Sequence, residues 1–352
     1  MTPESKQFLQ QLLATPGVSG YEAPVQRVVS EYAKPFADSQ QTDLHGNLIL
    51  ARNPGKELRV MLAGHADQIG MLVAYIDDGG MIYVKTVGGW DPQQLIGQRV
   101  IIWTHSGPVS GVISRKAIHL QSEEERKQLS KIEDLWVDIG AKDKAEATKI
   151  VAIGDSVTLQ LGFLELMNGL ATAPAMDNRT GLWVVVEALR RATALQPHCS
   201  LYAVSTVQEE IGLRGAKTAA FSVDPQIGVA VDVTHATDTP NIDKRISGEI
   251  KMGSGPVIFR GPNINPKISQ RFVEICEQTK LPYQMAALGI AAPNDSNSLQ
   301  VNRAGVATGL LSIPNRYMHS AVEVVSLVDL ENTAELLARF CVTISDADEF
   351  LP

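Results

Sequence analysis

The feature that most constrains the fold is an apolar, β-branched run at residues 201–207, which ends in two adjacent carboxylates, Glu209 and Glu210. Such a run is typical of a strand buried on both faces of an α/β sheet. Ligands bind beyond the carboxyl ends of strands in these sheets, so the pair stands where chemistry is usually performed. Two like charges at that place require a counter-charge, a raised pKa on one carboxyl, or contact with solvent. For the pair taken alone, a solvated loop is the better explanation, and only a counter-charge from elsewhere in the chain changes this.

The pattern of predicted strands and helices changes twice along the chain, and this predicts an inserted domain. Strand and helix patterns alternate over residues 1–69 and 164–352, as expected of one discontinuous α/β domain with a central mixed sheet flanked by helices. Residues 70–163 instead carry short β-rich runs separated by Gly, Asp and Pro turns, with one polar helix near residues 122–131. We expect this segment to form a small β-barrel-like domain.

The N-terminal region carries two helix-start patterns. Thr2, followed by a proline, predicts a capped helix that runs to about residue 13. Ser19 and Glu22 match the capping box of a second helix. Two apolar runs follow at residues 48–51 and 58–62, and we expect them to form paired strands.

Composition excludes several classes of partner. The net charge of -8 and the pI near 5.4, without a basic stripe, argue against nucleic-acid and anionic-membrane partners. No run reaches the length of a membrane span, and the N-terminus lacks the pattern of a signal peptide. The three cysteines are far apart and odd in number, so we expect buried thiols and a cytoplasmic protein.

Side chains of the metal-ligand type follow apolar runs or stand in short polar loops. They are His65, Asp67, Asp177, Glu209, Glu210, Asp232 and His319. Each has a structural alternative when taken alone, such as a helix cap, a turn residue or a hydrogen-bonded histidine. Together, two imidazoles and several carboxylates near one sheet edge suit a pair of divalent cations of the zinc, cobalt or manganese type. Two cations would also neutralise the repulsion between Glu209 and Glu210.

Five segments extend this interpretation by their sequence and order. They are GHADQIGM at 64–71, MDNR at 176–179, QEEIGLRGA at 208–216, DVTH at 232–235 and RYMHS at 316–320. In this order they resemble the M42 family of metallo-aminopeptidases, which includes the tetrahedral aminopeptidases and the glutamyl, lysyl and deblocking enzymes. The resemblance covers essentially the whole chain, including the β-rich insert.

The resemblance implies a role for each candidate metal ligand. One metal would be held by His65 and Asp232, and the other by Glu210 and His319. Asp177 would bridge the two ions. The implied cofactors are two divalent ions per subunit, with zinc or cobalt favoured and manganese as a third candidate.

The resemblance also implies the reaction and the assembly. N-terminal residues would be hydrolysed from short peptides by a hydroxide that bridges the metals, with Glu209 as general base and Asp67 orienting His65. Residues 70–163 would be a dimerisation domain. Dimers of this family commonly assemble into a tetrahedral homododecamer with active sites facing an inner cavity.

Three positions depart from the pattern of the family. Gln68 stands where Glu is usual, Pro174 where Lys is common, and the loop at 294–297 differs from the usual Thr-Asp-Ala form. None of these departures removes a ligand, but they leave the substrate preference and details of subunit packing open. The role of His235, close to Asp232, is also left open.

Three other functions remain at this point. A metal-dependent deacylase or carboxypeptidase on the same fold would differ only in how the ends of the substrate are held. A glycoside hydrolase of the endoglucanase type would use paired carboxylates without metal, which the two histidines argue against. A non-catalytic binding or assembly subunit would have no physical need to retain Glu209 beside a full ligand set.

Overall fold

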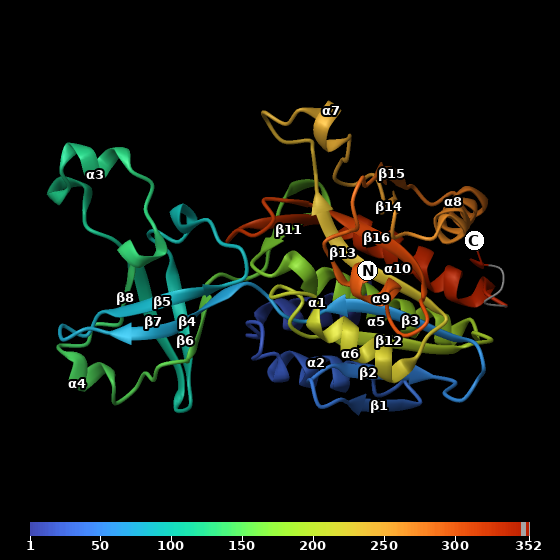
Figure 1. The fold of residues 1–352 in the computed structure, drawn as a ribbon, viewed down its shortest axis with the longest axis horizontal. Coiled ribbons are helices and arrows are strands. Elements are labelled where there is room, and N and C mark those ends of the chain that lie inside the picture. Colours follow the sequence, from blue (N-terminus) through green and yellow to red (C-terminus); the bar gives the residue numbers. More distant parts are fainter. Residues whose placement is uncertain (346–349, 352) are drawn as a thin grey trace.

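The computed structural model describes residues 1–345 and 350–351 of the chain. The chain forms an α/β body and a smaller barrel that projects from it, and the first and last described residues both lie in the body (Figure 1). The predicted fold class is confirmed, since a mixed sheet flanked by helices accompanies a closed antiparallel barrel.

The body is built on an 11-stranded sheet with the order β1-β2-β12-β3-β13-β16-β17-β11-β10, to which β14 and β15 are added beside β16. The strands are β1 (Ser39–Thr42), β2 (Leu48–Arg52), β3 (Arg59–His65), β10 (Leu164–Glu165), β11 (Leu170–Ala173), β12 (Ser200–Thr206), β13 (Ile227–His235), β14 (Val257–Arg260), β15 (Gln284–Ala287), β16 (Ala307–Arg316) and β17 (Glu323–Ser326). The neighbours β12, β3, β13 and β16 are parallel. Their carboxyl ends therefore meet at one edge of the sheet.

One predicted strand pairing is wrong. The runs at 48–51 and 58–62 form β2 and β3, but β12 lies between them, antiparallel to β2 and parallel to β3. Chain proximity favoured a direct pair. Because β12 is apolar on both faces, it instead takes a position inside the sheet, with neighbours on both sides.

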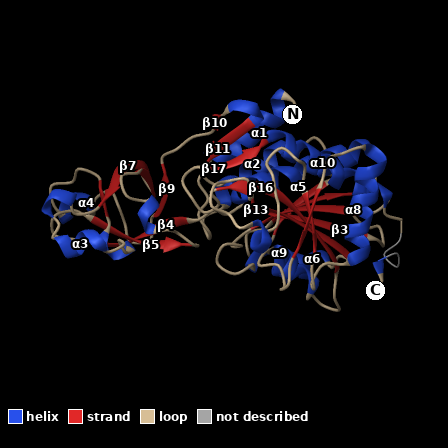
Figure 2. Cartoon of the chain, turned by 90° about the horizontal axis from the view of Figure 1, so that it is seen from above, coloured by secondary structure: helices blue, strands red, loops and turns tan. Residues whose placement is uncertain are grey.

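Helices cover both faces of the sheet (Figure 2). One face carries α1 (Pro3–Ala14), α2 (Ala23–Ala33), α5 (Met176–Ala194), α8 (Pro266–Thr279) and α10 (Leu327–Thr343), and the other carries α6 (Arg214–Val223) and α9 (Asp295–Gln300). A short helix, α7 (Lys244–Ser247), lies in the connection after β13. Alternation along a strand separates the two cores: Val60 and Leu62 of β3 pack on the α5 side, and Met61 and Ala63 on the α6 side.

Close contact between β3 and α5 sets the position of one predicted ligand. A Cβ atom at Gly64 would lie 2.8 Å from the backbone nitrogen of Leu182 and 2.9 Å from Gly181, so only glycine permits this approach. The indole of Trp183 anchors the same helix by donating to the carbonyl of Ser5 at 2.9 Å. The first turn of α5, with Asp177, is thereby held beside the end of β3.

The two N-terminal helix starts had different outcomes. Thr2 caps α1 as predicted. The predicted capping box of α2 is wrong, because the helix begins after Glu22 without a side-chain cap. The Ser19 hydroxyl instead donates to Asp67 Oδ2 at 2.6 Å, and Glu22 Oε1 accepts the amide of Gln208 at 3.1 Å. Both polar groups therefore hold loops that carry candidate site residues.

The barrel is closed in the order β4-β5-β8-β7-β6-β9 and has a core of its own. Its strands are β4 (Gly70–Ile76), β5 (Ile82–Val87), β6 (Arg99–Thr104), β7 (Gly107–Ser114), β8 (Trp136–Asp138) and β9 (Ser156–Leu159), accompanied by the short helices α3 (Glu123–Lys127) and α4 (Lys144–Ala147). The polar helix expected near 122–131 is thus shorter than predicted. Since β3 ends at His65 and β4 begins at Gly70, the barrel starts next to the candidate site.

Candidate metal centre

The sheet brings the predicted ligands together at the carboxyl edge of its parallel strands. All seven candidate residues lie in one cluster: His65 at the end of β3, Asp67 just after it, Glu209 and Glu210 after β12, Asp232 in β13, His319 after β16, and Asp177 in the first turn of α5. The parallel order of β12, β3, β13 and β16 is the reason, because each strand delivers its following residues to the same edge.

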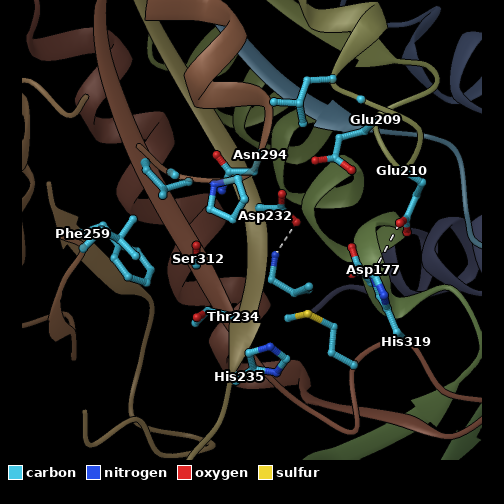
Figure 3. Close-up of a pocket in the computed structure, with 18 residues that line it drawn as sticks. Asp177, Glu209, Glu210, Asp232, Thr234, His235, Phe259, Asn294, Ser312 and His319 are labelled. Atoms are coloured by element: carbon cyan, nitrogen blue, oxygen red, sulfur yellow. Dashed lines mark hydrogen bonds and ion pairs between the residues drawn. The ribbon is translucent and has the colours of Figure 1, made fainter. Parts of the chain in front are cut away.

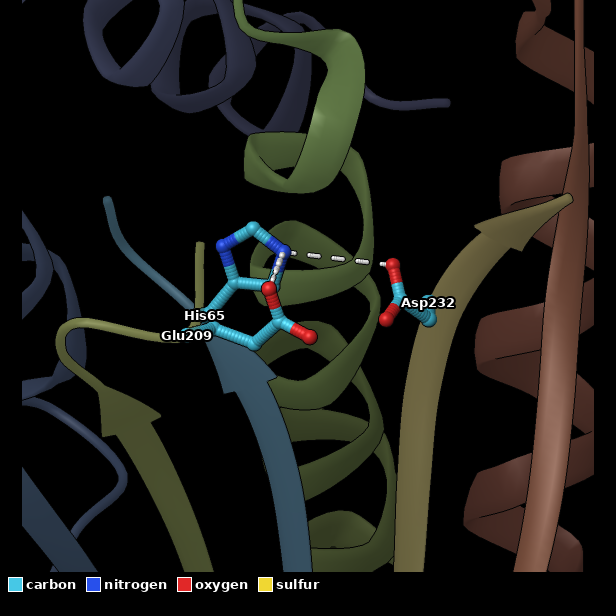
Figure 4. Close-up of side chains that lie close together, drawn as sticks. All are labelled: His65, Glu209 and Asp232. Atoms are coloured by element: carbon cyan, nitrogen blue, oxygen red, sulfur yellow. Dashed lines mark ion pairs between the residues drawn. The ribbon is translucent and has the colours of Figure 1, made fainter. Parts of the chain in front are cut away.

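His65 stands at the centre of one half of the cluster (Figure 4). Its Nε2 atom lies 3.3 Å from Asp177 Oδ1, 3.7 Å from Glu209 Oε2 and 3.9 Å from Asp232 Oδ1. The residue is 1% exposed. Three carboxylates therefore surround one buried ring nitrogen.

His319 forms the other half (Figure 3). Its Nε2 atom lies 3.3 Å from Asp177 Oδ2 and 3.4 Å from Glu210 Oε2. The two oxygens of Asp177 thus face different histidines at the same distance. The potential ligand atoms of His65, Asp177 and Glu210 lie within 4.8 Å of one another, as do those of His65, Glu209 and Asp232.

The cluster holds more negative charge than its imidazoles can balance. Burial, reinforced by neighbouring carboxylates, raises the pKa of Glu209 to about 10 and that of Asp232 to about 8, and it raises the pKa of Glu210 well above its usual range. Burial alone would lower the pKa of His65, but Glu209 and Asp177 raise it. Ionised carboxylates in this setting call for further positive charge.

The donor set fits divalent metal ions. Glu210 Oε1 is buried and has no hydrogen-bond partner among the described residues, which is costly for a carboxylate oxygen unless a cation meets it. Imidazole and carboxylate donors suit zinc, cobalt and manganese. Two ligand atoms about 2.1 Å from a tetrahedral ion are separated by ~3.4 Å. The histidine–carboxylate distances of 3.3 and 3.4 Å match that separation.

Asp67 supports the cluster from behind. The main-chain oxygen of Asp67 lies 3.1 Å from His65 Nδ1, whereas its Oδ1 lies 3.4 Å away. Its carboxylate accepts the Ser19 hydroxyl and the backbone amides of Glu209 at 3.0 Å and Glu210 at 3.1 Å. The carboxylate thus holds the two glutamates, while the carbonyl is the closer partner of the histidine ring.

Two buried acids beside the cluster were not singled out from the sequence. Glu323 in β17 accepts the amides of Asp177 at 2.9 Å and His319 at 2.8 Å. Asp295 accepts the Thr206 hydroxyl at 2.7 Å, and burial raises its pKa to about 6. A lone Glu before an apolar strand and an Asp in a helix-capping loop are common surface patterns, so neither residue could be recognised from its local sequence.

Gln68 contacts a buried cation. The guanidinium of Arg179 is fully buried and donates to Gln68 Oε1 at 3.2 Å and to main-chain carbonyls, including that of Leu12 at 2.6 Å. Burial lowers the pKa of Arg179 to about 10. Gln68, one of the three departures from the family pattern, is therefore the side-chain acceptor of the buried Arg179 guanidinium behind the centre.

The loop after β5 approaches the same centre from the barrel. A Cβ atom at Gly89 would lie 3.1 Å from His319 Nδ1, and one at Gly88 would lie 3.4 Å from Glu210 Oε2. The backbone of Gly89 hydrogen-bonds the His319 ring. The barrel therefore contributes directly to the surroundings of one histidine and one glutamate.

Several known proteins resemble this chain in sequence and in fold. A model of the M42 glutamyl aminopeptidase family matches residues 46–336. The lysyl aminopeptidase of Pyrococcus furiosus is 38% identical over 334 residues, which cover 94% of each chain. The TET aminopeptidase of a marine sediment archaeon of the Thaumarchaeota superposes with a TM-score of 0.94 at 32% identity, covering 99% of both chains. The TET1 peptidase of Pyrococcus horikoshii gives 0.86 at 30% identity, covering 97% of this chain and 100% of its own.

The fold, the acidic and imidazole cluster and these relatives define a peptide hydrolase. The chain belongs to the M42 family of metal-dependent aminopeptidases. Among the described residues, no helix is both long enough and apolar enough to cross a membrane.

Proposed function

We propose that this enzyme is a two-metal aminopeptidase that removes the N-terminal residue of short peptides. The observation that carries the proposal is the placement of Asp177, whose two oxygens each lie 3.3 Å from a different histidine. A carboxylate in this position is suited to bridge two ions. Zinc and cobalt fit the donors best, and manganese is the third candidate.

The proposed ligand assignment divides the cluster into two halves. His65 and Asp232 would hold one ion, Glu210 and His319 the other, and Asp177 would contact both. His319 Nε2 lies 3.4 Å from Glu210 Oε2, and Glu210 Oε1, which has no hydrogen-bond partner among the described residues, is free to bind an ion as well. His65 Nε2 lies 3.9 Å from Asp232 and 3.7 Å from Glu209, so the distances permit either acid beside His65, and the resemblance to the family favours Asp232. Asp67 would keep His65 oriented and hold the glutamate loop in place.

Glu209 would act as the general base. Bound divalent ions would supply acidification of a water molecule and polarisation of the scissile carbonyl. Glu209 would accept the proton of that water at its carboxylate and deliver it to the leaving amine. Burial favours the protonated form of Glu209, and the charge of nearby ions would favour the ionised form, so the group can both gain and release a proton. A free α-amine pairing with a cluster carboxylate would restrict cleavage to the first peptide bond.

We also propose that residues 70–163 act as a dimerisation domain and that dimers assemble into a tetrahedral homododecamer. The TET1 peptidase of Pyrococcus horikoshii is described as assembling into a tetrahedron or a large octahedral shell. The barrel of the present chain has a separate core and stands out from the body, where it can meet another subunit (Figure 1). Light scattering coupled to gel filtration would distinguish monomer, dimer and dodecamer by mass.

A cytoplasmic location stays a prediction from the cysteines, which the structure places as unpaired, buried thiols.

The decisive experiment compares apo protein with protein reconstituted with zinc, cobalt or manganese, using unblocked and N-acetylated peptides. We expect two ions per chain, turnover only in the reconstituted protein, and cleavage only of the unblocked peptide. Cleavage of the acetylated peptide would instead favour the deacylase or carboxypeptidase alternative. Hydrolysis of a glucan by chelator-treated protein would favour a glycoside hydrolase, since that mechanism needs no transition metal.

A further inference from the structure

We infer that the enzyme prefers peptides whose first side chain is neutral and apolar; this inference rests on the proposed aminopeptidase function. A cavity of about 610 Å³ opens beside the metal centre (Figure 3). Asp177, Glu210 and His319 line one side of it, and Phe259 lies on the opposite side in the view of Figure 3. A substrate with its first peptide bond at the centre would place its first side chain in this cavity.

The side of the cavity remote from His319 is an apolar wall. Phe259 comes from β14, Leu310 from β16, Leu288 from the segment after β15, and Ala292 from the loop before α9. Phe259, Leu310 and Ala292 are buried, and Leu288 is half-buried against the same core. Because four separate segments converge on one packed core, the wall is formed before any substrate arrives.

The wall is continuous with the metal centre. Ser312 of β16 pairs with Asp232 of β13. Leu310 lies two residues before Ser312 and therefore on the same face of β16. The polar side chains of the lining outside the cluster, Ser312, Thr234 and Asn294, are uncharged. The first side chain of a bound peptide would therefore contact small polar groups close to the scissile bond and apolar groups farther from it.

Outside the metal cluster, an ionised side chain would find no buried counter-charge among the described residues that line this cavity. Apart from the cluster and the exposed His235, the described lining residues contain no ionisable side chain. The four carboxylates that line the cavity, Asp177, Glu209, Glu210 and Asp232, would carry four negative charges when ionised, which the four positive charges of two divalent ions would balance. Burial of an unpaired Glu or Lys side chain is unfavourable, whereas burial of Leu or Met against the wall is favourable.

This inference separates the chain from what its relatives' names suggest. The matching family is described as glutamyl aminopeptidases, and one relative at 38% identity as a lysyl aminopeptidase. A glutamyl or lysyl preference requires a fixed counter-charge near the end of the first side chain. Such a counter-charge is absent from the described lining of this cavity.

The test uses the metal-loaded enzyme with 4-nitroanilides of Leu, Met, Lys and Glu. We expect kcat/KM to be at least tenfold higher for Leu and Met than for Lys and Glu. A Lys or Glu substrate that matches Leu would overturn the inference. Calorimetric binding of the hydroxamates of Leu, Lys and Glu provides a second readout, because all three share one metal-binding group. If no anilide is cleaved but the leucine hydroxamate binds at least tenfold tighter, the proposed function fails and the pocket preference stands; equal binding would refute the preference.

A charge introduced into the wall tests which residue sets the preference. Leu288→Lys should raise the Glu-to-Leu ratio of kcat/KM at least tenfold. Met285→Lys adds the same charge at an exposed position of β15 outside the cavity, and it should leave the ratio unchanged. Both melting temperatures should be recorded to confirm folding. An unchanged ratio in folded Leu288→Lys would show that the wall does not contact the first side chain.

Discussion

The backbone amide of Asp177 donates a hydrogen bond to the carboxylate of Glu323 at 2.9 Å, and Glu323 is only 2% exposed. The other oxygen of the same carboxylate accepts the amide of His319 at 2.8 Å, where the backbone has the left-handed φ of 59°. A non-glycine residue adopts that conformation at a cost, which the hydrogen bond offsets. One buried acid therefore fixes the backbone of His319 and of Asp177, the residue that lies between the two halves of the metal centre.

We predict that Glu323→Gln weakens metal binding at the half of the centre formed by His319. Glutamine has one acceptor oxygen, so one of the two amides would face its NH2 group instead. We expect metal affinity of this half to fall about tenfold or more, measured by calorimetric titration of apo protein.

Asp329→Asn is the matched control. Asp329 is likewise buried and accepts two amides, those of Gly253 at 2.7 Å and Gly255 at 2.8 Å, outside the cluster. This variant should lose stability and keep its metal affinity. Equal metal affinity in both variants would reduce Glu323 to a purely structural role.

Glu209→Gln should retain both ions and lose turnover by about 10²–10⁴-fold, the usual contribution of a general base. Metal content by mass spectrometry and kcat on an aminoacyl-anilide provide the two measurements. Glu210→Gln, the same change one residue later, should lose an ion as well as turnover. Loss of an ion from Glu209→Gln would make Glu209 a ligand, a role that its position beside His65 and Asp232 would also permit.

The pH dependence of stability should depend in part on Glu187. This carboxylate is 0% exposed and accepts the Tyr32 hydroxyl at 2.6 Å and Arg190 Nη2 at 2.7 Å. Burial would raise its pKa, but the hydrogen bond from Arg190 gives a net lowering from 4.5. A lowered pKa stabilises the folded state above the unfolded value, and this contribution is lost as the pH falls below about 4.5 toward the folded value.

We therefore expect Glu187→Gln to lower the free energy of unfolding by about 2 kcal/mol at pH 7 and by less at pH 4, measured by urea denaturation. Glu31→Gln removes a comparable i,i+3 pair, with Lys34, in which both side chains are exposed. That variant should change stability by less than about 0.5 kcal/mol. If Glu187→Gln lowers the free energy of unfolding equally at pH 7 and pH 4, the charge of Glu187 does not contribute to stability.

Patterns with one local meaning were predicted correctly from the sequence. The apolar run at 201–207 correctly predicted the buried strand β12, and the two acids after it correctly predicted a polar edge of the sheet. Both predictions hold because neighbouring parallel strands end at the same edge. The order of strands did not follow, since β12 entered between two runs that are close in the chain.

Polar residues with two equally good uses were not predictable. Ser19 matched a helix cap but bonds Asp67, 48 residues away. Glu323 stands in a sequence pattern that is common at protein surfaces, but its carboxylate is buried behind the metal centre. In each case the partner comes from a distant segment, and only the folded chain determines which hydrogen bond forms.

Gln68→Glu should stabilise the protein. Arg179 is buried with Gln68 as its side-chain acceptor, and a hydrogen bond to a charged acceptor is worth about 1 kcal/mol more than one to a neutral acceptor. We expect the free energy of unfolding to rise by that amount at pH 7. The gain should be lost as the pH falls below about 4.5, because pairing lowers the pKa of the new carboxyl.

Gln26→Glu is the matched control. Gln26 is also 7% exposed, but its amide donates to the carbonyls of Gly46 and Ser205. A carboxylate there would repel both carbonyls, so this variant should be destabilised. If chemical denaturation shows both variants destabilised alike, the nearby Asp67 and Glu22 already compensate the charge of Arg179.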